Sequence, residues 1–276
     1  MKRISFFIAF VFVVFNINSE AKMTEKNLTI RIRMPKNGVY VIAHRGAHIG
    51  IPENSLAAYQ KAIDLGCDFV EIDVRTTKDG QFISMHNESV SQYDSTKSGR
   101  VTDLSFSEIR ALDIGSRVGP QWKNTKVPTF EEILILCHGK IGIYLDLKAA
   151  SMPGLVVIIR KYGMERDILW YISSSDMKSL KQLVAVCPEC LPMPDPGPKS
   201  NIESVLNQVG AKVLATDMGE LSEDFVTIAH SNNSMVITDE KAGTSAEWNQ
   251  ILEWKTDGIQ TDRPEELISF LKESRK

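Results

Sequence analysis

Short, nearly continuous apolar runs recur along this chain, separated by segments whose apolar residues follow helical spacing. Continuous apolar character, without alternation, is typical of parallel strands that are covered on both faces. The eight clearest runs are Val39–Ala43, Phe69–Val74, Phe82–Met85, Ile141–Leu147, Ile168–Ser173, Val213–Thr216, Met235–Thr238 and Gly258–Thr261. A shorter ninth candidate, Leu191–Met193, lies in the proline-rich segment Cys187–Pro198, which is otherwise expected to be a rigid loop. The alternative is that this segment, with Met193 and Asp195, shapes one wall of a binding pocket.

Helical patterns lie between many of these runs. Asn54 is expected to cap a helix over Ser55–Leu65, and Gly66 provides a C-terminal stop. Thr129 is expected to cap a second helix over Phe130–Cys137. Further helices are predicted over Ser105–Leu112, Asp176–Val186, Ile202–Val209, Ser222–His230 and Pro264–Lys272.

The alternation of strand and helix predicts an α/β domain with a parallel sheet. Eight or nine strands in about 250 residues fit a (β/α)8 TIM barrel, which we place at residues 37–275 as a single domain. A barrel of this kind has eight strands, so one of the nine candidates lies outside it or is wrong. The polar stretch Asn87–Pro128 breaks the rhythm and is expected to be a small insertion after the third strand.

Residues 1–21 have the pattern of a secretory signal peptide. Lys2 and Arg3 precede the apolar run Ile4–Phe15, and Ser19 and Ala21 are small residues at the positions of a cleavage site. The run is short for a membrane-spanning helix, although an uncleaved signal anchor is the alternative interpretation. The pattern predicts an exported protein, periplasmic or secreted, with no stable membrane insertion after cleavage.

Export permits disulfides, which bears on the four cysteines. Cys187 and Cys190 form an isolated C-x-x-C pair, which we interpret as a local disulfide or as two inert thiols. Cys67 and Cys137 lie in apolar segments and are expected to pack in the core.

Composition narrows the range of functions. The chain has 276 residues, 43% of them hydrophobic and 24% charged, which are ordinary values for a globular protein. The formal net charge is -3, and removal of the predicted signal makes it about one unit more negative. Without a basic excess or a basic stripe, general nucleic-acid binding is not expected. The oligomeric state is left open by the sequence.

Polar side chains that can take part in catalysis or bind a metal ion stand at or near the ends of four apolar runs. In a barrel, catalytic groups gather at the carboxyl ends of the strands, so these side chains are expected to meet there. They are His44 and Arg45 after the first run, Glu71 and Asp73 in the second, His86 after the third, and Asp146 and Lys148 in the fourth.

Glu71 and Asp73 share one face of their strand, because strand side chains alternate with a period of two. Two ionised carboxylates on an inner face repel each other, and a bound cation is the simplest remedy. Oxygen ligands from Glu71, Asp73 and Asp146 suit Mg²⁺ or Ca²⁺ better than zinc. The alternative is a structural ion-pair cluster with Arg45, Arg75 or Lys148.

His44 and His86 form a pair that can take one proton and give another, as hydrolysis of a diester requires. Arg45 can bind phosphate oxygens with two parallel hydrogen bonds, and Lys148 can add a point charge. His48, His138 and His230 lack comparable neighbours in the sequence and are expected at the surface or in loops. Trp170 or Tyr171 either lines the pocket as an aromatic wall, suited to a quaternary ammonium headgroup, or packs in the core.

The ordered motifs resemble those of the glycerophosphodiester phosphodiesterase family, over roughly Ile42 to Glu265. The matching runs are His44-Arg45-Gly46, Pro52-Glu53-Asn54-Ser55, Glu71-Ile72-Asp73-Val74, Thr77-Lys78-Asp79-Gly80, His86, Val127-Pro128-Thr129-Phe130-Glu131-Glu132, Leu145-Asp146-Leu147-Lys148 and Gly258-Ile259-Gln260-Thr261-Asp262-Arg263-Pro264.

The resemblance implies a TIM barrel and a phosphoric diester hydrolase of glycerol and lipid metabolism. Such an enzyme hydrolyses a small-molecule glycerophosphodiester to glycerol 3-phosphate and an alcohol with a divalent cation, Ca²⁺ or Mg²⁺. By the same resemblance, His44 and His86 are the general base and acid, and Arg45 and Lys148 hold phosphate. Glu71, Asp73 and Asp146 hold the metal, while Glu53 ties Arg45 in place or meets substrate.

The chain departs from the family pattern at three points. His86 is followed by Asn87 rather than Asp, an expected arginine is missing from Gln92–Thr96, and Asp146 replaces a glutamate. These changes bear on the headgroup more than on the chemistry. Two alternatives stay open: a phospholipase D-like barrel enzyme acting on lysophospholipid or sphingolipid, and a non-catalytic phosphodiester-binding relative.

Overall fold

The computed structural model describes residue 32 and residues 34–274, which belong to one compact unit spanning Arg31–Lys276. The predicted export signal, residues 1–21, lies outside the described residues. None of the helices in the described part of the chain is both long and apolar enough to span a bilayer.

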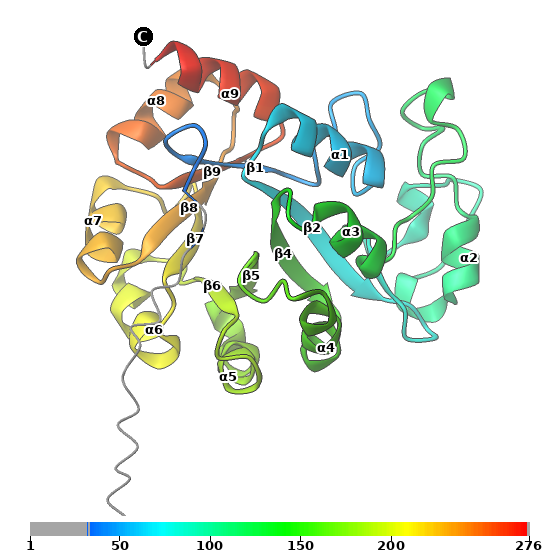
Figure 1. Cartoon of the computed structure of the whole chain (residues 1–276), viewed down its shortest axis with the longest axis horizontal. Coiled ribbons are helices and arrows are strands. Elements are labelled where there is room, and N and C mark those ends of the chain that lie inside the picture. Colours follow the sequence, from blue (N-terminus) through cyan, green and yellow to red (C-terminus); the bar gives the residue numbers. More distant parts are fainter. Residues whose placement is uncertain (1–31, 33, 275–276) are drawn as a thin grey trace, which may run out of the picture. The chain divides into compact units, whose positions relative to one another are not determined.

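Eight parallel strands form a nearly closed ring with helices around its outside (Figure 1). The order of neighbours is β6-β5-β4-β2-β1-β9-β8-β7, so the predicted TIM-barrel architecture is confirmed. The strands of the ring are β1 (Tyr40–Ala43), β2 (Phe69–Thr76), β4 (Gly142–Ala149), β5 (Ile168–Ser173), β6 (Leu191–Asp195), β7 (Val213–Asp217), β8 (Met235–Asp239) and β9 (Gly258–Thr261).

The helices cover the ring because the outward side of each strand is apolar. Ile72 and Val74 of β2 are fully buried in the layer between strands and helices, together with Trp170 of β5. Full burial of a side chain of this size contributes about 1.5–3 kcal/mol. The helices are α1 (Leu56–Leu65), α2 (Phe106–Ala111), α3 (Phe130–Cys137), α4 (Met152–Tyr162), α5 (Met177–Val186), α6 (Ile202–Val209), α7 (Glu223–Ser231), α8 (Ser245–Glu253) and α9 (Pro264–Glu273).

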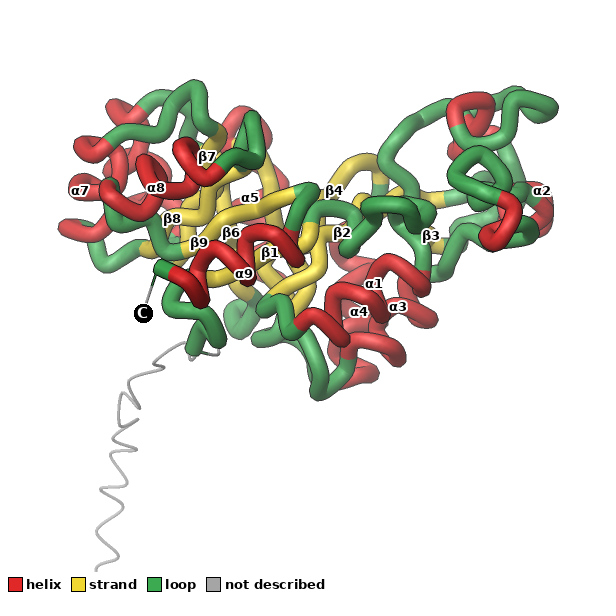
Figure 2. The backbone as a smooth tube through the Cα atoms, turned by 90° about the horizontal axis from the view of Figure 1, so that it is seen from above, coloured by secondary structure: helices red, strands yellow, loops and turns green. Residues whose placement is uncertain are grey.

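The surplus strand candidate is β3 (Phe82–Ser84), which pairs antiparallel with the end of β2 and stands outside the ring. The segment that follows it carries α2 and lies to one side of the barrel (Figure 2). This segment has a small apolar core of its own, which includes Ile83, Val90 and Ile109. The predicted insertion is therefore present, and it begins at the third strand in sequence.

The ring has a seam between β6 and β7, which are neighbours without a hydrogen-bonded ladder among the described strand pairs. Pro192 and Pro194 of β6 pair with Trp170 and Ile172 of β5. Backbone N–H groups of a strand point alternately to its two neighbours, so prolines two residues apart remove donors on one side only. Because β6 is bonded to β5, the missing donors are those facing β7.

Several local expectations need correction. The ninth strand candidate, Leu191–Met193, is confirmed as part of β6, so the segment Cys187–Pro198 is not simply the rigid loop that was otherwise expected. Helices α4 and α8 follow β4 and β8 and were not predicted. Asn54 does not cap α1, because the cap is Ser55, whose hydroxyl accepts a hydrogen bond from the Ala58 backbone.

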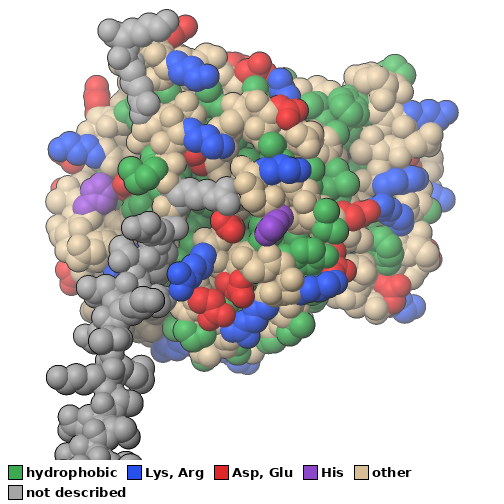
Figure 3. Space-filling model, in the orientation of Figure 1, with side chains coloured by type: hydrophobic (Ala, Val, Ile, Leu, Met, Phe, Trp, Pro, Cys, Tyr) green, Lys and Arg blue, Asp and Glu red, His purple; other side chains and the backbone are tan. Residues whose placement is uncertain are grey.

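The cysteine pattern resolves into one bridge and two thiols. Cys187 and Cys190 form a disulfide, while Cys67 and Cys137 are free and buried, as expected. On the face drawn in Figure 3, basic and acidic side chains are interspersed, in keeping with the small net charge.

Candidate active site

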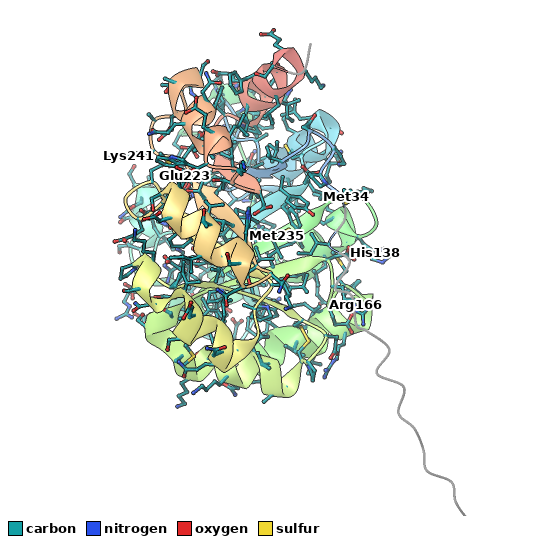
Figure 4. All side chains as sticks on the ribbon, turned by 90° about the vertical axis from the view of Figure 1, so that its left-hand side faces the viewer. Met34, His138, Arg166, Glu223, Met235 and Lys241 are labelled. Atoms are coloured by element: carbon teal, nitrogen blue, oxygen red, sulfur yellow. A yellow bond between two sulfur atoms is a disulfide. The ribbon has the colours of Figure 1, made fainter. Side chains whose placement is uncertain are left out.

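The predicted site residues lie at one end of the barrel, the end where the strands have their carboxyl termini. Glu223 and Lys241 lie in segments that follow β7 and β8, whereas Met34, His138 and Arg166 lie in segments that precede β1, β4 and β5 (Figure 4). A cavity of about 300 Å³ opens at the carboxyl end of the strands. Seven of the eight predicted site residues line it: His44, Arg45, Glu71, Asp73, His86, Asp146 and Lys148.

Three carboxylates converge on one side of this cavity. The register of β2 and β4 places Asp73 beside Asp146, and Glu71 projects from the same face of β2 as Asp73. Ligand oxygens of all three lie within 4.8 Å of one another. Glu71 and Asp73 are 2% and 1% exposed, so solvent does little to screen their mutual repulsion.

Two basic side chains stand among these acids. Lys148 Nζ lies 2.6 Å from Asp146 Oδ2 and 3.5 Å from Asp73 Oδ1, and Arg45 Nε lies 3.7 Å from Asp73 Oδ2. Arg75, the third candidate for a structural ion pair, instead donates to the backbone carbonyls of Met85 and His86. When all three acids are ionised, they carry one more negative charge than these two basic side chains supply.

The excess charge fits a divalent cation. Burial, together with the charge of Asp73, holds the pKa of the Glu71 carboxyl well above its usual range. Within the described part of the chain, Glu71 has no basic side chain within 4.0 Å, and Asp73 Oδ1 is buried with no hydrogen-bond partner. Oxygens left in this state are what a hard cation takes as ligands.

A strained turn after β1 brings the backbone into the site. Arg45 and Gly46 have φ values of 51° and 84°, and Arg45 N donates to Glu71 Oε2 over 2.7 Å. A Cβ on Gly46 would stand 2.7 Å from Ala58 Cβ, so only glycine lets the turn lie against α1. The turn thus fixes the carboxylate of Glu71, one of the three clustered acids, and places the Arg45 side chain at the cavity.

Asn54 has a role that sequence reasoning missed. It is buried, has a φ of 52°, and its amide Nδ2 donates to Asp73 Oδ2 over 2.8 Å. Its Oδ1 accepts from the hydroxyls of Tyr59 and Ser84, each at 2.8 Å. Both ends of the amide are therefore fixed, and Asn54 orients Asp73 instead of capping a helix.

His44 is oriented by a residue that no strand-end pattern singled out. Its Nδ1 lies 2.7 Å from Oδ1 of Asp262, in the motif after β9. Burial alone lowers the pKa of His44, but the hydrogen bond to Asp262 and the charge of Glu71 outweigh it and raise the pKa to about 9. His48 was expected at an unremarkable surface position, yet its Nε2 lies 3.6 Å from the same Asp262 oxygen.

His86 has a neutral partner in place of a carboxylate. Its Nδ1 lies 2.9 Å from Asn87 Oδ1, and the Asn87 backbone N–H donates to the Tyr93 hydroxyl over 3.0 Å. Arg75 holds the His86 carbonyl from the other side, with Nη2 at 2.6 Å. The departure from the family pattern at Asn87 thus changes the charge beside His86 but keeps a hydrogen-bonded orientation.

Glu53 does not line the cavity and instead supports Arg45. Its Oε2 lies 3.4 Å from Arg45 Nη1, and its Oε1 lies 3.3 Å from Arg117 Nη2, which comes from the insertion. Burial raises the pKa of Glu53, but the two arginines outweigh it and lower the pKa below its usual range. Of the two readings of Glu53, the structure favours a residue that ties Arg45 in place.

The opposite side of the cavity was predicted only in part, through the alternatives that placed Asp195 and Tyr171 at the pocket wall. It carries three aspartates at the ends of β6, β7 and β8, referred to below as the acidic row: Asp195, Asp217 and Asp239. Single aspartates at strand ends gave no pattern to notice. Tyr171 also lines the cavity, whereas Trp170 is fully buried in the helix layer.

The remaining histidines lie away from the cavity. His138 follows α3 and is exposed, as expected. His230 pairs with Asp257 over 2.8 Å at an exposed position.

Comparison with known proteins gives a consistent picture. Residues 44–266 match the sequence model of the Glycerophosphoryl diester phosphodiesterase family. A glycerophosphodiester phosphodiesterase of Caldanaerobacter subterraneus is 34% identical over 157 residues, which cover 54% of this chain and 63% of that relative. One from Bacillus subtilis is 25% identical over 251 residues, which cover 82% of this chain and 84% of that relative.

Solved structures share the fold. A phosphodiesterase of Oleispira antarctica, determined in complex with the product sn-glycerol-3-phosphate, superposes with a TM-score of 0.77 at 22% identity. The match covers 84% of this chain and 96% of that structure, and at this level of identity it establishes the barrel architecture.

Proposed function

The chain belongs to the glycerophosphoryl diester phosphodiesterase family, and we propose that it hydrolyses glycerophosphodiesters to glycerol 3-phosphate and an alcohol. The observation that carries this proposal is the meeting of two histidines and three acids, from β1, β2, β3 and β4, around one cavity. The metal, phosphate and proton-transfer groups that such a reaction needs are all represented among these side chains.

Glu71, Asp73 and Asp146 would hold the divalent cation, Ca²⁺ or Mg²⁺. When bound, such an ion stabilises negative charge that develops on the phosphoryl oxygens and orients the diester. Their all-oxygen donor set and their uncompensated charge support this assignment.

Arg45 and Lys148 bind the phosphate in this proposal. Both side chains line the cavity. Arg45 contacts Asp73 and Lys148 contacts Asp146, so a bound phosphate would lie beside the carboxylate cluster. Arg45 offers parallel N–H donors that match two phosphate oxygens, and Glu53 keeps the guanidinium in position.

His44 and His86 carry the two proton transfers. The Nδ1 of each ring is engaged, by Asp262 and Asn87 respectively, which leaves the two Nε2 atoms for the general base and the general acid. In the protein without a cation, His44 favours its protonated form. Because the charge of Glu71 is one cause of that preference, a cation on Glu71 favours the neutral imidazole that a base requires.

The cavity favours a small deacylated substrate over a lysolipid or sphingolipid. Its volume is about 300 Å³, and its lining is polar apart from the rings of Tyr144 and Tyr171. An acyl chain would need an apolar channel, and these side chains do not supply one. The presence of both histidines and all three acids supports turnover over simple binding.

The test is release of glycerol 3-phosphate from a glycerophosphodiester in the presence of Ca²⁺ or Mg²⁺, with wild type compared with His44→Ala. Loss of a proton-transfer group is expected to lower turnover by about 10²–10⁴-fold. Equal release by both proteins would refute the assignment of His44. No release by wild type with either ion would refute the proposed function.

We also propose that residues 1–21 direct export to the periplasm or the medium. The disulfide between Cys187 and Cys190 supports an oxidising destination. Mass spectrometry of the protein recovered outside the cytoplasm is expected to show an N-terminus near residue 22. An intact residue 1 in that fraction would contradict cleavage.

A further inference from the structure

The acidic row and its neighbour Gln260 form a continuous band across four adjacent strand ends. The register pairs Asp217 with Asp239, and Asp239 with Gln260 of β9. Asp195 ends β6, which lies beside β7. All four residues line the same cavity as the carboxylate cluster, but from its opposite side.

No basic side chain in the described part of the chain forms an ion pair with this band. In the described part of the chain, no lysine, arginine or histidine lies within 4.0 Å of the carboxylates of Asp195, Asp217 or Asp239. Burial raises the pKa of both Asp195 and Asp239, and Asp217 acts on each in the same direction, while the charge of His44 opposes the rise at Asp239. A cation bound among these carboxylates would relieve this repulsion.

Gln260 independently indicates a ligand. It is only 6% exposed, and its Oε1 is buried without a hydrogen-bond partner among the described residues. Its neighbour in the register of β8 and β9 is Asp239, whose ionised carboxylate only accepts hydrogen bonds and so supplies no donor to this oxygen. A buried amide oxygen without a donor is costly, and a ligand N–H would satisfy it.

The geometry argues against a second metal ion. In the described residues, a metal-type cluster of three side chains occurs at Glu71, Asp73 and Asp146, and the acidic row does not form one. Its carboxylates are spread along a row, and the Tyr171 hydroxyl donates to Asp195 over 3.4 Å. The Tyr171 ring stands 5.7 Å from that of Tyr144, so aromatic faces border the same space. Spread acceptors beside aromatic rings suit an organic cation.

We propose that the acidic row and Gln260 bind the protonated primary amine of the substrate's alcohol moiety, which makes diesters of amino alcohols the preferred substrates. The inference rests on the proposed function, because the phosphate must occupy the side of Arg45 and Lys148. A primary ammonium brings three N–H donors and a positive charge, which match an amide oxygen and several carboxylates. A quaternary ammonium offers the charge without the donors.

The test compares kcat/KM for glycerophosphoethanolamine, glycerophosphocholine and the uncharged-headgroup diester glycerophosphoglycerol, with Mg²⁺ or Ca²⁺ present. Wild type is expected to prefer the ethanolamine diester to the glycerol diester by about tenfold. Asp217→Asn is expected to reduce that preference by about fivefold, mainly through KM. Asp217 is exposed, and asparagine keeps the oxygen that accepts from the Gly219 N–H, so the loop is preserved.

Glu220→Gln is the matched control, because it removes one charge from the same loop outside the cavity lining. An equal effect of both substitutions would show a long-range field in place of a contact and would overturn the proposal. A choline diester used as well as the ethanolamine diester would overturn the assignment of a hydrogen-bonded amine.

Binding measurements separate this proposal from the proposed function. Calorimetric titration of wild type and Asp217→Asn with glycerophosphoethanolamine and glycerophosphoglycerol needs no turnover. Tighter binding of the ethanolamine diester to wild type, weakened in the variant, supports the subsite even if no product forms. Equal affinities overturn the subsite, and glycerol 3-phosphate release in the same preparation would leave the hydrolase assignment standing.

Discussion

Both sides of the cavity carry acids, but only the side built by β1, β2 and β4 pairs them with basic side chains. Glu71, Asp73 and Asp146 face Lys148 and Arg45, whereas no basic side chain of the described residues lies within 4.0 Å of the acidic row. The charge of His44 acts on Asp239 from a greater distance. A dication on the first side would turn its single excess negative charge into a positive one, which attracts phosphate. The second side stays negative, so the cavity is polarised along the direction in which a phosphodiester with a cationic end would lie.

The comparison also concerns rigidity. The acids of the first side are held by buried groups, as Asn54 Nδ2 holds Asp73 and the Arg45 backbone holds Glu71. Those of the second side are held by turn backbone, as Gly197 N and Gly219 N hold Asp195 and Asp217. Ligands fixed by buried groups suit a metal ion, whereas carboxylates held by turn backbone can adjust to an ammonium group.

The largest effect is expected from Asp73→Asn, which removes a charge from the first side and leaves its shape. Turnover should fall by at least about a thousandfold, because the site loses a metal ligand that no neighbour replaces. The thermal midpoint should stay near that of wild type, since the substitution also removes repulsion with Glu71. The readouts are glycerol 3-phosphate release and a melting curve.

Asp64→Asn, on the exposed face of α1, is the control for a generic loss of charge. Undiminished activity in Asp73→Asn would break the comparison, because the first side would then be a structural ion-pair cluster and not a metal site.

A smaller effect is expected from Asp262→Asn. The substitution keeps the hydrogen bond to His44 Nδ1 but removes the charge, so the ring stays oriented while its protonated form loses support. Turnover should fall by about 10–100-fold, as for a partner that orients a catalytic group. An NMR titration of the metal-free protein should show the pKa of His44 well below the value of about 9 in wild type. An unchanged pKa would mean that Glu71, and not Asp262, controls His44.

Asn54→Ala tests the rigidity of the first side. It leaves Asp73 Oδ2 without its amide donor, and the hydroxyls of Tyr59 and Ser84 without their shared acceptor. Stability should fall by about 1–3 kcal/mol, and turnover by about tenfold. Because Asn54 has a positive φ, Asn54→Gly serves as the partner variant: it loses the same hydrogen bonds without strain. Full activity in the glycine variant would show that Asp73 needs no support.

The sequence predicted the first side of the cavity but, of the second side, only Asp195 and Tyr171 as alternatives, for a physical reason. Glu71 and Asp73 lie two residues apart on one strand, and His44 and His86 directly follow apolar runs. A short stretch of sequence is therefore enough to identify each of them as a candidate site residue. The aspartates of the acidic row are single residues on separate strands, and only ring closure brings them together. Asp262 is likewise distant, since it meets His44 across 218 positions.

The misassigned elements have equally local causes. The prolines of β6 favoured a loop over the strand candidate Leu191–Met193, but they face the seam of the ring, where no ladder is formed among the described strands. Pro153 and Gly154 at the start of α4 concealed a helix whose Leu155 and Ile159 are fully buried. Tertiary packing overrides these residue preferences, so composition alone could not reveal the elements.

The smallest effect concerns how His44 links stability of the metal-free protein to pH. Burial opposes its charge, but Asp262 and Glu71 prevail, so its folded pKa of about 9 exceeds the unfolded value of about 6.5. Folding then binds a proton, and the resulting stabilisation is complete below about pH 6.5 and is lost as the pH rises through about 9. Asp262 is 56% exposed, so solvent screens the pair and the change is modest. The melting temperature, measured between pH 6 and 10, should therefore fall more steeply with pH for wild type than for Asp262→Asn. The same pH dependence in both proteins would contradict the coupling.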